Sequence, residues 1–78
     1  MKTTAYFEAM RTRSDRAVIQ DEWIQRALRA PLREEFQADG RRRRWVRIPE
    51  AGDRVLRVVL LSDGETVHNA FFDRRFRP

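Results

Sequence analysis

Cysteine is absent from this 78-residue chain, and histidine and tyrosine occur only once each. Without cysteine there is neither a disulfide framework nor a thiolate metal site, and a reducing cytoplasm is the default compartment. One histidine and scattered carboxylates leave at most a weak magnesium site. No apolar run approaches a membrane span, and the N-terminal stretch is too mixed for a signal peptide. We therefore expect a cytoplasmic protein that needs no cofactor or metal and has no membrane partner.

Linkers, repeats and low-complexity tracts are also missing, which predicts a single domain over residues 1–78. A domain this small buries only about 60 to 65% of the surface that its unfolded chain exposes. The chain has no glycine-rich phosphate loop, no serine in a nucleophile turn and no helix-turn-helix pattern. These absences exclude the glycine-loop nucleotide-binding, serine-hydrolase and helix-turn-helix DNA-binding classes.

Positive charge is abundant and unevenly placed. The net charge is +5. Residues 1–40 contain seven basic and seven acidic side chains, whereas residues 41–78 contain ten basic and five acidic ones. The excess therefore lies in the second half, and a basic patch on one half of a small domain predicts a polyanion or an acidic protein as partner.

Two helices are predicted, over residues 4–13 and 21–30. In the first, Tyr6, Phe7 and Met10 have the spacing of one apolar helical face. The second begins with two acidic residues, which suit the positive end of a helix dipole, and it ends before a proline.

From residue 32 onward the apolar residues recur with a period of two, and turn signals interrupt them. This pattern predicts a meander of four strands. With the helices, it predicts an α+β domain in which the two N-terminal helices pack on one face of a four-stranded antiparallel meander sheet. The predicted strands cover residues 32–37, 42–49, 54–61 and 66–72.

The pairing of the last two strands follows from their turn. Asp63-Gly64 favours a two-residue type I′ turn. That turn would place Leu56 opposite Phe71, and Val59 opposite His68.

In the middle hairpin, hydrophobic matching places Val46 opposite Val58 on the core face. The same register places Arg47 directly opposite Arg57. The first hairpin has two short-loop registers, which place Arg44 opposite Glu35 or Phe36.

An anion site is predicted on the face away from the helices. Like charges directly opposite cost about 0.2 to 1 kcal/mol, and an anion between Arg47 and Arg57 would turn this repulsion into binding. Guanidinium groups hold phosphate in a bidentate way, and Trp45 and Phe72 could stack unpaired bases. This interpretation predicts single-stranded RNA on the sheet. The alternative is a solvated surface whose arginines pair with acidic neighbours. The predicted anion-binding face contains Arg43, Arg47, Arg57 and His68.

His68 is the one side chain whose ordinary pKa lies near neutrality. RNA cleavage by the 2′-hydroxyl needs a base, an acid and positive charge at the transition state. His68 could be the acid or base, with Arg47 and Arg57 as charge stabilisers, and these three are the candidate catalytic residues. The alternative is a surface histidine that is hydrogen-bonded to a neighbour.

Further arginines before the second strand and in the C-terminal tail are candidate nucleic-acid contacts. The tail could equally be a structural element, because Phe71, Phe72 and Phe76 would close the core or its edge. The candidate contacts are Arg41, Arg42, Arg43, Arg44, Arg74, Arg75 and Arg77.

Several motifs occur in order along nearly the whole chain. They include an aromatic helix with Met-Arg over residues 6–11 and an acidic-apolar helix over 21–31. DGR precedes the second strand, Leu-Arg-Val-Val occupies 56–59, and DGETVHNAFFDRRF occupies 63–76. In these motifs the chain resembles the small RelE-like and BrnT-like toxins of type II toxin-antitoxin pairs, and an allied group of short bacterial proteins.

This resemblance implies a RelE-like fold and a metal-independent mRNA endoribonuclease that an acidic antitoxin holds inactive. It supports Arg47, Arg57 and His68 as catalytic residues, and Arg74 and Arg75 as substrate contacts. Two features depart from the pattern, because the chain has a single lysine and its first helix has no histidine. The residues are equally compatible with a non-catalytic nucleic-acid binder, or with a protein-interaction module for an acidic partner.

Overall fold

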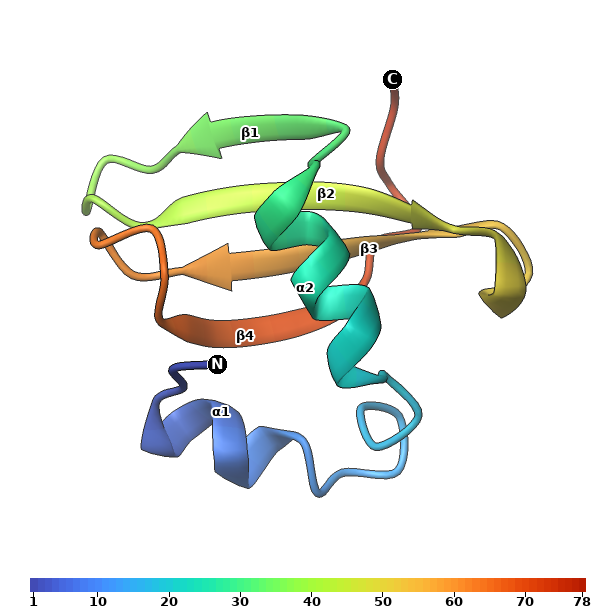
Figure 1. Cartoon of the computed structure of the whole chain (residues 1–78), viewed down its shortest axis with the longest axis horizontal. Helices are drawn as coiled ribbons and strands as arrows, with labels where there is room; N and C mark the ends of the chain where they lie inside the picture. The colour runs from blue at the N-terminus through green and yellow to red at the C-terminus, as the bar shows by residue number, and fades with distance from the viewer.

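A computed structural model describes residues 1–78 as an α+β domain of two helices and one four-stranded antiparallel sheet (Figure 1). The strand bounds agree with the predicted ranges to within one residue. Nowhere does the structure contain a helix with the length and apolar character of a membrane span. The elements are α1 (Ala5–Met10), α2 (Asp21–Arg29), β1 (Arg33–Phe36), β2 (Arg42–Ile48), the 3₁₀ turn η1 (Pro49–Ala51), β3 (Arg54–Leu60) and β4 (Val67–Phe72).

Helix α1 is shorter than predicted because hydroxyl groups act at both of its ends. Thr4 is the N-cap, and its hydroxyl oxygen accepts a hydrogen bond from the Phe7 N–H at 3.1 Å. Beyond Met10, the Thr12 hydroxyl donates to the Ala9 carbonyl at 2.7 Å, in place of a continued helical hydrogen bond. The chain then turns through residues 11–18 toward α2.

The sheet is a meander in the order β1-β2-β3-β4, with α2 across one face and α1 beside β4 (Figure 1). Ala27 of α2 is fully buried, so the helix backbone can approach β2 and β3 closely. Both helices contribute side chains to a single core cluster. Its members are Phe7, Ile19, Trp23, Ile24, Ala27, Val46, Ile48, Leu56, Val58, Leu60, Val67 and Ala70.

The predicted register of β2 with β3 is wrong by two residues. Val46 lies opposite Leu56, Trp45 opposite Arg57, and Arg47 opposite Val55. The cause is the loop, because Pro49 starts the turn η1 and the strands pair only as far as Ile48 and Arg54. A shift of two residues preserves the face of every side chain, but it removes the direct Arg47–Arg57 pair.

The predicted register of β3 with β4 is correct only next to the turn that joins the two strands. Leu60 lies opposite Val67 as expected, but Val59 lies opposite Asn69, so His68 has no partner on β3. This bulge sits where the N-terminal segment binds the outer side of β4, through a Thr4 N–H bond to the Val67 carbonyl at 3.0 Å. As a result, Phe72 rather than Phe71 faces Leu56.

Two turn predictions are also corrected. The turn before β4 is not type I′, since Gly64 has a positive φ of 71° but Asp63 does not. Asp63 instead accepts hydrogen bonds from the Glu65 and Thr66 N–H groups. In the first hairpin Arg44 lies opposite Glu34, so neither of the two short-loop registers forms.

The core position of Leu56 gives a first test of the fold. Leu56 is fully buried between the sheet and the helices, so Leu56→Ala should lower the free energy of unfolding by about 2 to 5 kcal/mol. Urea denaturation would measure this loss. Val18→Ala, at a position that is 57% exposed, should change stability by less than about 0.5 kcal/mol. Equal effects of the two substitutions would contradict this core.

Candidate nucleic-acid interface

The run of four arginines does not form one patch, because side chains alternate between the two faces of β2. Arg44 points toward α2, where it pairs with Glu34 and donates to the Leu28 carbonyl at 3.1 Å. Arg42 lies over the Phe36 ring. Arg41 pairs with Asp39 at 3.7 Å.

Of the three arginines of the run that lie in β2, only Arg43 shares the open face with Arg57. The Gln37 amide, with its oxygen turned toward Arg43, accepts two hydrogen bonds from this guanidinium at 2.6 and 2.8 Å. The charge of Arg43 also helps to lower the pKa of Arg57. These two predicted residues are therefore electrostatic neighbours.

Arg47 and Arg57 share a face but bind different aspartates. Arg47 is exposed and pairs with Asp53 at 3.4 Å. Arg57 contacts Asp73 at 3.8 Å. The structure therefore separates the two guanidinium groups that the sequence placed opposite one another.

Arg57 is held among aromatic rings. Its guanidinium lies 5.7 Å from the Trp45 ring and 5.3 Å from the Phe71 ring. Burial lowers the pKa of Arg57, and Arg43 adds to this effect, but an arginine stays charged in this range. Its Nε is buried without a hydrogen-bond partner. Arg57 is thus a weakly compensated cation at the edge of an aromatic cluster.

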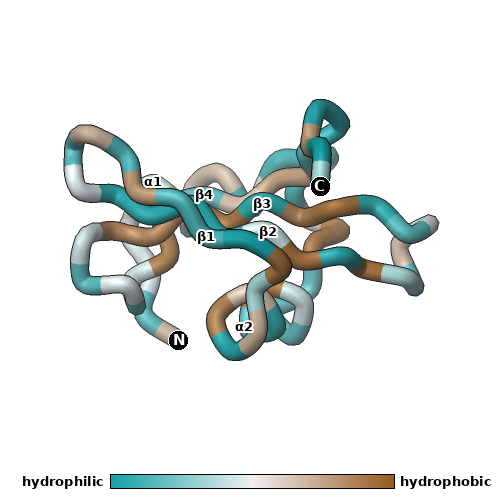
Figure 2. Tube along the Cα trace, turned by 90° about the horizontal axis from the view of Figure 1, so that it is seen from above, coloured by the Kyte–Doolittle hydropathy of each residue, from teal (hydrophilic) through white to brown (hydrophobic).

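The C-terminal tail covers the open face of the sheet over Trp45. Figure 2 shows the C-terminus and α2 on opposite sides of the strands. The Trp45 indole N–H donates to the Asp73 carboxylate at 2.9 Å, and the Phe76 ring lies 5.6 Å from the indole. Trp45 is consequently only 4% exposed. It cannot stack bases as predicted, and Phe76 has a structural role.

His68 lies apart from the predicted catalytic arginines. Its ring stacks on Tyr6 at 4.8 Å, and its Nδ1 is 3.0 Å from the Thr4 hydroxyl. Along β4, His68 is three residues from Phe71, the partner of Arg57, which corresponds to roughly 10 Å of strand. The structure therefore does not bring His68, Arg47 and Arg57 together.

Two adjoining depressions lie at the C-terminal end of β4, with volumes of about 460 and 350 Å³. Both are lined by Phe71, Phe72 and Arg74. Their charged lining consists of five arginines and two aspartates, so it is strongly basic. We call this the basic aromatic surface, and it comprises Arg16, Arg54, Arg57, Arg74, Arg75, Phe71 and Phe72, with Asp15 and Asp73 at its border.

Cation–π contacts organise this surface. The Arg54 guanidinium lies 3.8 Å from the Phe72 ring centre, and that of Arg16 lies 5.3 Å from the Phe71 ring. Arg16 is anchored by a 2.6 Å hydrogen bond to the Asn69 side-chain oxygen. Arg16 and Arg54 are thus positioned before any ligand arrives.

The sequence pattern predicted Arg57, Arg74 and Arg75 of this surface but not Arg16 and Arg54. Arg16 belongs to a loop before α2, and nothing in the local pattern indicates that it reaches β4. Arg54 could have been found, because the correct register of β3 with β4 places Phe72 near the start of β3.

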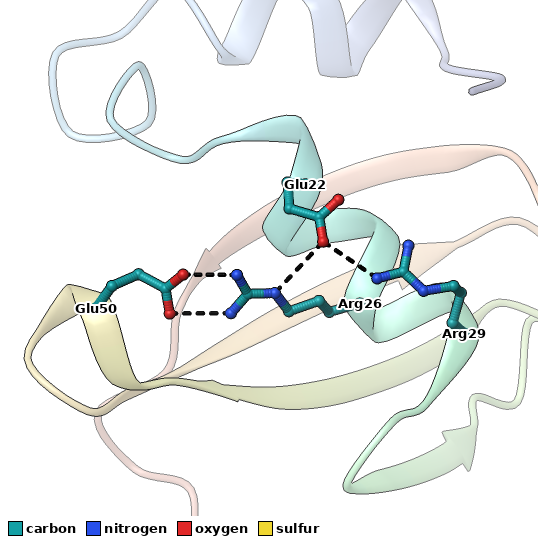
Figure 3. A network of polar contacts seen from close by, with 4 residues as sticks. All are labelled: Glu22, Arg26, Arg29 and Glu50. Atoms are coloured by element: carbon teal, nitrogen blue, oxygen red, sulfur yellow. Dashed lines mark hydrogen bonds and ion pairs between the residues drawn. The ribbon is translucent and has the colours of Figure 1, made fainter.

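Other arginines are neutralised by structural ion pairs. Arg26 makes a bidentate contact with Glu50 at 2.9 and 2.6 Å, and Glu22 lies near both Arg26 and Arg29 (Figure 3). The hydrogen bonds from Arg26 lower the pKa of Glu50 to about 2. This network joins α2 to η1, so its arginines have a stabilising role. By contrast, Arg54, Arg74 and Arg75 have no acidic partner within ion-pair distance.

Comparisons of the chain with protein-family models, with curated proteins and with solved structures gave no match. The RelE-like and BrnT-like resemblance therefore stays a prediction.

The environment of His68 predicts a pH dependence of stability. Burial lowers the pKa of His68 from its ordinary 6.5, and the charge of Arg41 adds to this effect. Below pH 6.5 the unfolded state therefore binds a proton more readily than the folded state, and stability falls as the pH falls through this window. Urea denaturation at a series of pH values should show this slope.

His68→Gln should remove that part of the slope. Glu50 and Asp63 also have lowered pKa values, both about 2. Their effect on stability falls at a more acidic pH, so it should be the same in wild type and in His68→Gln. If wild type and His68→Gln have the same slope between pH 7 and pH 5, the assignment to His68 is wrong.

Proposed function

We propose that this protein binds single-stranded RNA on the basic aromatic surface, without cleaving it through His68. One observation carries the proposal, namely that two adjoining depressions share Phe71 and Phe72 and are lined by five arginines and only two aspartates. Phosphates along the RNA would contact the guanidinium groups.

Unpaired bases would bind to the aromatic and guanidinium groups of the same surface. Bases stack on aromatic rings and on guanidinium planes, and they can do so only when they are free of a duplex. The exposed guanidinium of Arg54 lies on Phe72, which provides such a plane beside the cationic side chains. RNA rather than DNA is the substrate that the family resemblance implies.

The endoribonuclease hypothesis requires His68, Arg47 and Arg57 to act on one phosphate. Each of these side chains is instead held by a separate set of neighbours. We therefore propose RNA binding as the activity, with an acidic antitoxin as a competitor for the same arginines. A RelE-like arrangement, with both helices serving one face of the sheet, is the fold that we propose for this binding surface.

Removal of two tail charges tests the location of the RNA. Arg74 and Arg75 are exposed and have no ion-pair partner, so Arg74→Ala/Arg75→Ala should weaken binding without unfolding the protein. If both contact phosphates, the slope of log K against log salt should become shallower by about 1.4, since each contact to a single strand contributes about 0.7. Fluorescence anisotropy with a labelled single-stranded RNA would measure it.

The matched control is Lys2→Ala/Arg29→Ala, which removes the same charge from two exposed residues that have acidic partners. It should leave the salt slope nearly unchanged. If both double variants lose affinity equally, binding depends on net charge and not on the basic aromatic surface.

Incubation of RNA with the purified protein tests the absence of His68-dependent cleavage. Gel analysis should show no product that appears with wild type and disappears with His68→Ala. Retention of RNA binding by His68→Ala would show that the variant is folded. Cleavage that is lost in His68→Ala would refute this part of the proposal and restore the endoribonuclease hypothesis.

A further inference from the structure

Strand β1 is an open edge of the sheet. It pairs with β2 alone, and no segment runs along its other side (Figure 1). The Gln37 N–H donates to the Arg41 carbonyl, and in an antiparallel pair the direction of the backbone groups alternates. The backbone N–H and C=O groups of Glu34 and Phe36 therefore point away from β2. Such an edge is a ready template for another strand.

Two large apolar side chains lie at the ends of this edge. Leu32 is 52% exposed and Phe36 is 68% exposed, which makes Phe36 the most exposed large hydrophobic residue of the chain. Phe36 ends β1, whereas Leu32 comes just before the strand and its N–H donates to the Trp45 carbonyl of β2 at 2.7 Å. Neither belongs to the core cluster.

We propose that two copies of this chain associate through their β1 edges, as an antiparallel pair with Glu34 at the two-fold axis. In this register Leu32 lies opposite Phe36 of the second copy, and Phe36 lies opposite its Leu32. The two-fold axis forms this apolar contact twice, so both exposed apolar residues of each copy are covered. The two sheets become one continuous sheet.

Charge complementarity selects this register. Arg33 lies opposite Glu35 of the second copy, on the face away from α2, and symmetry repeats the pair. Opposite charges directly across two strands favour pairing. A shift by two residues in one direction would place Glu35 opposite Glu35, and in the other direction Arg33 opposite Arg33; either shift would move Leu32 away from Phe36.

The one like-charge contact lies on the axis, between the two Glu34 side chains. Each Glu34 already pairs with Arg44 of its own chain, and both partners are largely buried. The carboxylate charge is thus compensated before association.

The proposed contact involves one short strand from each copy, so the interface is small. Formation of the dimer should therefore depend on protein concentration.

A charge-reversal series tests the proposal by sedimentation velocity over a concentration range. Wild type should shift from monomer to dimer mass as concentration rises. Glu35→Arg should abolish the shift, because it places two arginines opposite each other. Arg33→Glu/Glu35→Arg should restore it, since the double change re-forms opposite-charge pairs; a merely unfolded single variant would not be rescued in this way.

Substitution at the apolar ends provides a second readout. Phe36→Glu should remain monomeric at concentrations where wild type is dimeric. Val18→Glu is the matched control, because Val18 is 57% exposed and far from β1 in the chain, and it should dimerise as wild type does. A wild type that stays monomeric at every concentration would overturn the proposal.

Disulfide trapping tests the register itself, since the natural chain has no cysteine. On the axis, the two Cα atoms of Glu34→Cys would lie about 5.5 Å apart, within reach of a disulfide. Oxidation should therefore cross-link Glu34→Cys more readily than Glu35→Cys. Preferential cross-linking of Glu35→Cys would place the axis elsewhere and refute this register.

Discussion

The alternation of side chains along β2 is the constraint on which the rest of the structure depends. One strand has to place Val46 and Ile48 in the core and also accommodate a run of arginines. Strand geometry sends Arg44 to the same side as these core residues, where Glu34 and the end of α2 satisfy it. It sends Trp45 to the other side, where the helices cannot cover it. A second, smaller cluster must therefore form on the open face.

Asp73 holds that second cluster together. Its carboxylate accepts from the Trp45 indole and contacts Arg57, and it also accepts from the Arg75 N–H at 3.0 Å. Burial alone would raise the pKa of Asp73, but these hydrogen bonds and the charge of Arg57 hold it below its ordinary value. The carboxylate therefore stays ionised, and it directs the tail back over the sheet. The same turn of the chain leaves Arg74 and Arg75 free at the border of the basic aromatic surface.

The sequence predicted the elements well, because apolar periodicity and turn residues are local signals. It predicted the pairing poorly, because register depends on loop geometry and on contacts with distant segments. Pro49 begins a turn that shifts Arg47 away from Arg57. The bulge at His68 forms where Thr4, more than sixty residues earlier in the chain, binds β4. The candidate catalytic trio depended on those two registers. Arg74 and Arg75 were predicted from charge placement and from the family resemblance, neither of which depends on register, and both line the basic aromatic surface.

The two proposed surfaces are consistent with each other because of where the net charge of +5 lies. Copies of a cationic protein repel one another, and they can associate only through a region that is locally neutral or complementary. The β1 edge is such a region, since Arg33 is accompanied there by Glu34 and Glu35. The basic aromatic surface lies at β4, on the opposite edge of the sheet. Pairing through β1 would therefore keep the two cationic surfaces at the far ends of the dimer. Each surface would stay open to RNA, whether one RNA strand contacts both surfaces or each surface binds its own strand.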